Sequence, residues 1–148
     1  MSNPAAAPAP ITINGTEYLM SPLTSKDITE LNMFIKQEIL ATAKEFCKDE
    51  SNKSIIDATM KAAMEQTRTV DWIVDSTLLQ SMDRLIYLFW MGVRNNPPRP
   101  SRSVFATMML NDWSAYFDTC MDTLQLVNPF LQLKERKEVP VQDQPPTQ

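Results

Sequence analysis

A dense run of hydrophobic residues covers positions 78–94. Six of its apolar side chains recur at intervals of three and four residues: Leu78, Met82, Leu85, Ile86, Phe89 and Val93. This spacing places them on one face of a helix, and Leu79, Leu88 and Trp90 widen the apolar surface. A helix that is apolar on most sides is buried. The pattern therefore predicts a core helix, which ends at the Asn-Asn-Pro-Pro sequence of residues 95–98.

Two short runs of β-branched and aromatic residues, 11–13 and 16–20, flank Asn14-Gly15. Asn-Gly between such runs is typical of a two-residue turn in which both residues have positive φ. We therefore expect a small β-hairpin, which must pack on a helix or a partner because two strands alone are not stable. Residues 1–10 alternate Ala and Pro and predict a flexible arm.

Two helices are expected between the β-hairpin and the core helix. Thr24 is the expected cap of the first, whose apolar face contains Ile28, Leu31, Ile35, Ile39 and Phe46. After a polar break at 48–52, a weaker helix contains Ile55, Ile56, Met60, Ala63 and Met64. Residues 70–74 fit a turn, a short strand or a helical start equally well, and Asp75-Ser76 is the expected cap of the core helix.

Two more helices are expected after the proline-rich loop. Ser101 or Ser103 is the expected cap of a short helix through Val104, Phe105, Met108 and Met109. Asn111 is the expected cap of the last helix, which contains Trp113, Phe117, Cys120, Met121 and Leu124 and ends at Asn128-Pro129. The predicted fold is mainly α: one domain at 11–132 with four to five helices and an N-terminal β-hairpin, followed by a disordered charged and Pro/Gln-rich tail at 133–148.

Composition narrows the function. The chain has only two glycines, which disfavours an all-β fold, and its net charge of −4 gives no general attraction to nucleic acid or anionic membranes. There is no histidine, no phosphate-binding glycine loop, no nucleophile elbow and no metal-ligand spacing. The sequence therefore predicts a non-enzymatic protein with no catalytic residues, no metal and no cofactor.

Several charged residues and thiols have a structural and a functional interpretation. Pairs of acids four residues apart, Asp118 with Asp122 and Asp71 with Asp75, could hold a cation, but a solvated face is favoured. Arg94, Arg99 and Arg102 around the proline loop could contact a phosphate or carboxylate of a partner. Cys47 and Cys120 are expected to be reduced, buried thiols, with one disulfide as the alternative.

The ten methionines favour core filling, with an adaptable binding surface as the alternative, because thioether side chains repack around unlike partners. The three tryptophans lie near predicted helix ends or off the main apolar stripe, where partly exposed aromatic residues anchor interfaces. On the second interpretation the partner-binding residues are Trp72, Trp90, Met91, Met108, Met109 and Trp113.

Residues 11–24, Ile-Thr-Ile-Asn-Gly-Thr-Glu-Tyr-Leu-Met-Ser-Pro-Leu-Thr, resemble the start of tail assembly chaperones of long-tailed bacteriophages. In that family a small hairpin leads through a Pro-Leu-Thr/Ser step into a helix with an Asp-x-x-Glu-Leu element, here residues 27–31. Residues 85–97 are similar to the family's apolar helix, which closes with a small residue, Arg and Pro. The resemblance covers about residues 11–130, and the proline-rich loop at 95–100 and the long arms depart from it.

The resemblance implies a protein of the host cytoplasm that coats the tape measure protein, keeps its apolar helix soluble and recruits tail tube subunits. Members of the family often have a longer form made by ribosomal frameshifting. The alternative is a structural head, neck or tail protein of the mature virion, and self-association is compatible with both. No signal peptide or membrane span is expected, because residues 1–10 lack an apolar core and Asp83-Arg84 interrupt the apolar run. On the chaperone interpretation, Trp90→Ala or Met91→Ala should weaken tape measure binding more than it lowers stability.

Overall fold

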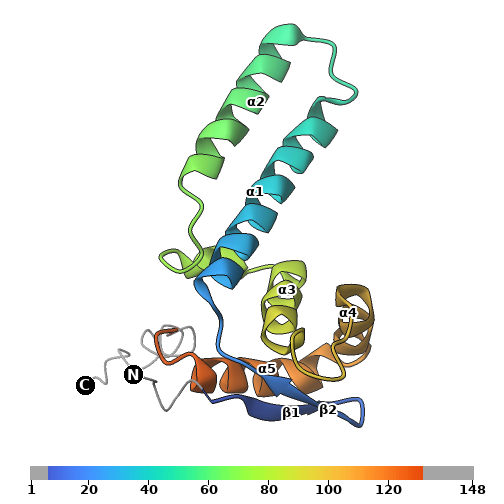
Figure 1. Ribbon diagram of the computed structural model, residues 1–148. Coiled ribbons are helices and arrows are strands. Elements are labelled where there is room, and N and C mark those ends of the chain that lie inside the picture. The colour runs from blue at the N-terminus through green and yellow to red at the C-terminus, as the bar shows by residue number, and fades with distance from the viewer. Residues whose placement is uncertain (1–6, 132–148) are drawn as a thin grey trace, which may run out of the picture. The chain divides into compact units, whose positions relative to one another are not determined.

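The computed structural model describes residues 7–131, which form a two-stranded β-hairpin, five α-helices and one short 3-10 helix (Figure 1). The predicted fold class, a mainly helical chain with an N-terminal β-hairpin, is confirmed. The described chain divides into two compact units: the first contains the chain up to Thr24 and from Leu85 onward, and the second is Ser25–Arg84. The predicted tail at 133–148 and residues 1–6 of the predicted arm lie outside the described residues.

The β-hairpin consists of β1 (Ala9–Ile13) and β2 (Thr16–Met20). Asn14 has φ 54° and Gly15 has φ 80°, so the turn is the predicted one with positive φ at both positions. Strand β1 begins at Ala9, so two residues assigned to the flexible arm are part of the sheet. Alternate side chains point to one face and are buried there: Ile11, Ile13, Tyr18 and Met20.

Pro10 pairs with Leu19 across the β-hairpin. The carbonyl of Leu19 points away from β1, since it accepts a hydrogen bond of 2.9 Å from Nδ2 of Asn96. Pro10 and Leu19 are therefore a non-hydrogen-bonded pair, and the missing N–H of Pro10 removes no bond from the ladder.

Three helices complete the first unit: α3 (Met82–Val93), which begins three residues before the unit boundary, α4 (Arg102–Asn111) and α5 (Trp113–Val127). The β-hairpin packs on α5, as Figure 1 shows. The buried side chains of these helices include Leu88, Phe89, Met91, Val93, Phe105, Met109, Cys120, Met121, Leu124 and Val127. The first unit thus buries the inner face of the β-hairpin among the apolar faces of its helices.

Two predicted helix starts are wrong. The core helix begins at Met82 because Asp75 caps a separate 3-10 helix, η2 (Ser76–Leu79), by accepting from the backbone N–H of Thr77. Asn111 is the last residue of α4, and Asp112 is the only residue between α4 and α5. The predicted cap at Ser101 is confirmed, since its Oγ accepts from the backbone N–H of Val104 at 3.2 Å.

Strand β2 and the end of α3 meet at a glycine. A Cβ atom added at Gly92 would lie 2.7 Å from Cγ of Met20, closer than side-chain carbons approach. Beside this contact the backbone N–H of Ser21 donates to the carbonyl of Gly92 at 2.7 Å. Asn96, just after the helix, donates through Nδ2 to Oγ of Ser21 at 2.7 Å. The absence of a side chain at Gly92 therefore lets the chain after β2 bond directly to the α3 backbone.

Asn128 holds the chain after the β-hairpin against the end of α5. It is one of two buried polar residues among those described, at 1% exposure. Its Oδ1 accepts from the backbone N–H of Leu23 at 2.8 Å, and its Nδ2 donates to the carbonyl of Leu124 at 2.9 Å. Both polar atoms of this buried amide are therefore satisfied, as a buried amide requires.

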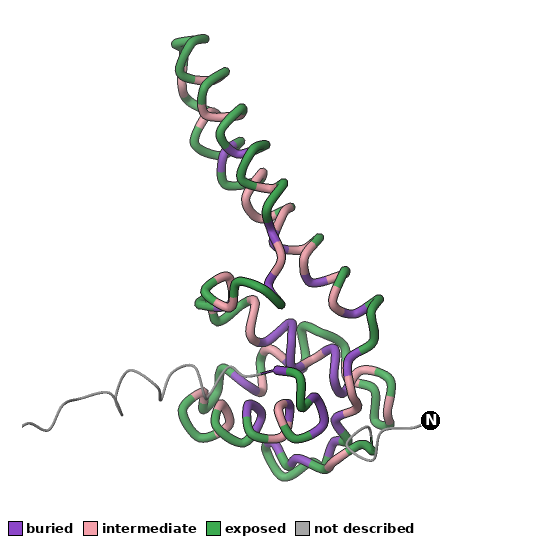
Figure 2. The backbone as a smooth tube through the Cα atoms, turned by 90° about the vertical axis from the view of Figure 1, so that its left-hand side faces the viewer, coloured by how far each residue is buried: buried purple, intermediate pink, exposed green. Residues whose placement is uncertain are grey.

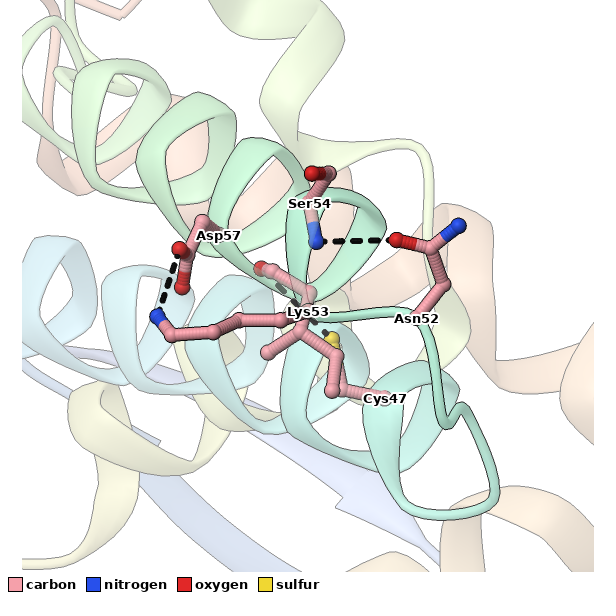
Figure 3. A network of polar contacts seen from close by, with 6 residues as sticks. Cys47, Asn52, Lys53, Ser54 and Asp57 are labelled. Atoms are coloured by element: carbon pink, nitrogen blue, oxygen red, sulfur yellow. Dashed lines mark hydrogen bonds and ion pairs between the residues drawn. The ribbon is translucent and has the colours of Figure 1, made fainter.

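The second unit is built on two antiparallel helices, α1 (Ser25–Cys47) and α2 (Lys53–Arg68), which we call the helical pair. Asn52 caps α2 by accepting from the backbone N–H of Ser54 at 2.9 Å (Figure 3). Near the same end, Sγ of Cys47 lies 4.0 Å from the carbonyl oxygen of Ile56. Figure 2 shows that exposed and half-buried residues prevail along both helices.

The open end of the helical pair is closed by the chain that follows α2. Residues 70–74 form turns, which selects one of the three structures that the sequence left open. Trp72 is fully buried there, with its backbone N–H donating to Oδ1 of Asn32 at 2.9 Å and its Nε1–H to the carbonyl of Ile28 at 3.1 Å. Nε of Arg84 pairs with the Glu38 carboxylate at 2.7 Å.

Gly92→Ala should lower the free energy of unfolding by about 1–3 kcal/mol, because the new methyl group overlaps Met20. Urea denaturation measures this loss. In the double variant Gly92→Ala/Met20→Ala the overlap is relieved, so the loss should be smaller than the sum of the two single losses. Strictly additive losses would show that Met20 and Gly92 are not in contact.

Asn128→Ala should cost about 2–3 kcal/mol, because it leaves the buried N–H of Leu23 without an acceptor. Asn111→Ala is the matched control: Asn111 is exposed at the end of α4, so its loss should stay within about 0.5 kcal/mol. Thermal unfolding of both variants decides the matter, and equal melting temperatures would contradict the role of Asn128.

Candidate partner-binding surface

The structure separates the six predicted partner-binding residues by burial. Trp72, Met91 and Met109 have 0%, 2% and 0% of their surface exposed, whereas Trp90, Met108 and Trp113 are half-buried. Trp72 belongs to the second unit and the other five to the first. The three buried side chains fill cores, so a partner cannot reach them without opening the fold.

The half-buried residues of the first unit are held by directed contacts. Nε1–H of Trp90 donates to the carbonyl of Pro100 at 2.9 Å, and the Arg94 guanidinium lies over its ring, 4.9 Å from the centroid. A second guanidinium, that of Arg102, lies 4.7 Å from the centroid of Tyr87, whose ring meets Trp90 edge-on at 5.5 Å. These aromatic rings fix the loop that joins α3 to α4, and two of the three arginines that could contact a phosphate or carboxylate of a partner, Arg94 and Arg102, stack on them.

Trp113 and Met108 also have structural contacts. The ring of Trp113 lies 5.3 Å from that of Phe117 and 6.5 Å from that of Phe89, which makes a three-ring cluster between α3 and α5. The hydroxyl of Tyr18 donates to Sδ of Met108 at 3.3 Å. Each of these two side chains thus uses part of its surface to join elements of the first unit.

The described residues also include acidic groups, two thiols and a depression on α1. Between residues 7 and 131, no three acidic residues or cysteines come together as metal ligands, and no helix is both long and apolar enough to cross a membrane. A depression of about 520 Å³ along the first turns of α1 is lined by Ser25, Lys26, Thr29, Glu30 and Met33. Both cysteines are free thiols; burial raises the pKa of Cys120 to about 12, and Cys47 is half-buried.

Large apolar side chains are exposed on both helices of the helical pair. Phe46 of α1 is 60% exposed and Ile55 of α2 is 42% exposed, whereas Val74, the most exposed large apolar residue of the second unit at 71%, lies outside the two helices. The sequence placed Phe46 on the apolar face of its helix, but α2 offers little to cover it: Ala63 is the only buried residue of α2. A signal that sequence reasoning did not use is the small volume of Ala58, Ala62 and Ala63 in α2.

The first unit also exposes large apolar side chains, on four separate segments: Leu19 on β2, Val104 and Leu110 on α4, Leu126 on α5 and Phe130 after it. Single exposed apolar residues are normal on protein surfaces. The helical pair is therefore the stronger candidate, because its exposed residues lie on two helices that run side by side.

Met91→Ala should lower the free energy of unfolding by about 2–5 kcal/mol, because it opens a cavity in the first unit. This corrects the expectation from sequence that the variant would act on partner binding and spare stability. Met33→Ala, at a methionine that is 51% exposed, should change stability by less than about 0.5 kcal/mol. Urea denaturation compares the two, and an unchanged midpoint for Met91→Ala would contradict its burial.

Comparison of the chain with models of protein families, with curated proteins and with solved structures finds no match.

Proposed function

We propose that this chain is a non-enzymatic tail assembly chaperone of a long-tailed bacteriophage. In the host cytoplasm it binds apolar helices of the tape measure protein and brings tail tube subunits to them. The observation that carries the proposal is the poor coverage of the helical pair: α2 buries only Ala63, while Phe46 and Ile55 stay exposed.

Exposed apolar side chains on two neighbouring helices suit the binding of another helix. A protein that keeps an apolar helix soluble must offer an apolar surface to that helix. This surface must not be buried in the protein's own core. Exposed apolar surface costs solubility, and a chain keeps it where a partner covers it. The helical pair has this property.

The segments that carry the resemblance have clear structural roles, which supports the proposal. Residues 11–20 form the β-hairpin, and the Pro-Leu-Thr step leads directly into α1 at Ser25. Leu31 of the Asp-x-x-Glu-Leu element is fully buried. Gly92, the small residue near the end of the apolar helix, receives Met20 and Ser21. The residues that carry the resemblance thus include those that make packing contacts and hydrogen bonds between the elements of each unit.

Co-expression tests the proposal. The chain is produced together with the tape measure and tail tube proteins encoded in the same genome. The expected result is that the tape measure protein stays in the soluble fraction and co-elutes with the chain. A tape measure fragment without its apolar helices is the control and should not co-elute.

Mass spectrometry of purified mature particles separates the proposal from its alternative. A chaperone should be missing from them, whereas a structural component should be present in a fixed copy number. A tape measure protein that precipitates with and without the chain would overturn the proposed function.

A further inference from the structure

Two sides of the helical pair can be told apart from the contacts between α1 and α2. Ala43 and Ala63 are buried between the helices, and Cys47 lies beside Ile56. These four residues mark the line of contact. The residue before each of them is rotated by about 100° from the contact line.

Because α1 and α2 run in opposite directions and face each other, a step back of one residue turns side chains on both helices toward the same side of the pair. Four residues take this position: Thr42 and Phe46 on α1, Ile55 and Ala62 on α2. Ala58 lies three residues after Ile55 and four before Ala62, so it shares their face. We call these five residues the open face.

The five residues of the open face are uncharged, and the charged residues at its edge include Glu45 and Glu65, three residues after Thr42 and Ala62, which pair with Lys48 and Arg68. All five of its residues are exposed, with Phe46 at 60% and Ile55 at 42%. Four of the five are apolar, and the fifth, Thr42, adds one hydroxyl, a group that within a helix can donate to the carbonyl four residues earlier. A partner helix could therefore cover the open face without leaving a charged group buried.

The opposite side of the helical pair, one residue after each contact residue, contains Lys44, Lys48, Asp57 and Met64. Lys53 also pairs with Asp57 at 2.9 Å, as Figure 3 shows. The two sides of the same helical pair therefore differ in polarity, one mainly apolar and one charged.

We propose that the open face binds the apolar side of one amphipathic helix from a partner protein, which completes a three-helix bundle with α1 and α2. The inference rests on the proposed function and assigns the site for it. The contacting side of the occupant must be uncharged, because a charge buried against Phe46 and Ile55 would have no partner.

The occupant is a helix because α1 and α2 offer no backbone groups for pairing. Their N–H and C=O groups are bonded within each helix, so an extended peptide would lose its bonds to water and gain none. A helix satisfies its own backbone. Small residues at Ala58 and Ala62 let its axis approach to the usual 8–10 Å between packed helices.

The size of the open face argues against a second copy as its occupant. Only two of its five side chains, Phe46 and Ile55, are large, so the open face is far smaller than the roughly 800 Å² per partner of a stable interface. Two copies joined only through this face would not form a stable dimer. A long partner helix can instead be held by several copies, each contributing one weak contact.

Fluorescence anisotropy with a labelled 18-residue model peptide tests the open face. The peptide has Leu and Ala along one helical side and Lys and Glu on the other; a peptide of the same composition in scrambled order is the control. The full chain should bind the amphipathic peptide and not the scrambled one. Phe46→Glu and Ile55→Glu should each weaken binding at least tenfold, because a carboxylate would be buried under the peptide.

Met64→Glu is the matched control variant. Met64 is 55% exposed on the same helix as Ile55 but lies on the charged side, so its binding should stay within twofold of the parent chain. Circular dichroism checks that all variants keep their helicity. Equal loss in Met64→Glu and Ile55→Glu, or no binding of the amphipathic peptide by the parent chain, would overturn the assignment.

Sedimentation velocity tests the second copy directly. A parent chain that dimerises, and loses the dimer in Phe46→Glu, would show that the occupant is another copy and would overturn the inference. The outcome is separable from that of the proposed function. If Ile55→Glu still keeps the tape measure protein soluble, the open face is wrong and the chaperone function stands. If the model peptide binds but no tape measure protein co-elutes, the open face stands and the chaperone function is wrong.

Discussion

The first unit depends on the approach of β2 to α3 at Gly92. A two-stranded sheet has too little core to be stable alone and needs a surface to pack on. With no side chain at Gly92, Met20 lies against the helix backbone and Ser21 donates to the Gly92 carbonyl. Asn96 and Asn128 then bind the chain on either side of this point. A β-hairpin that is weak by itself is thereby fixed to helices that come much later in the chain.

In the second unit, one end of the helical pair is well packed and the other is packed sparsely. Trp72, Asn32 and the Arg84–Glu38 pair close one end of the helical pair with buried and hydrogen-bonded groups. Toward the other end the interface narrows to Ala43, Cys47, Ile56 and Ala63, most of them small, and Phe46 beside them stays exposed. The two helices are therefore held together by buried contacts at one end and leave an apolar surface exposed toward the other end.

Local features of the fold could be predicted from sequence because their causes are local. Asn14-Gly15 specifies its turn through the φ values of two residues, and Ser101 caps α4 through one hydrogen bond within four residues. The start of α3 was misplaced because Asp75 caps a 3-10 helix, which shares its cap chemistry with an α-helix. Helix spacing alone does not distinguish the two.

The candidate surface could not be predicted because burial is decided by residues far apart in the chain. Trp72 is a residue type that often anchors interfaces, but here it is buried. Its two hydrogen-bond acceptors lie forty and forty-four positions earlier in the chain. Phe46 has the spacing of a core residue, yet it is 60% exposed because α2 does not cover it. Apolar periodicity shows which face of a helix is apolar. Whether that face is buried or exposed to solvent depends on the volume of the neighbouring side chains.

Pro10 affects whether the edge of β1 can pair with a strand of another protein chain. The outer edge of β1 is a row of backbone groups to which a foreign strand could add. A proline facing outward lacks the donor that the incoming strand would need, so it interrupts that row without weakening the sheet itself. The fold thereby combines exposed apolar side chains on the helical pair with a strand edge that resists pairing, which lowers the risk that copies aggregate through their β-hairpins.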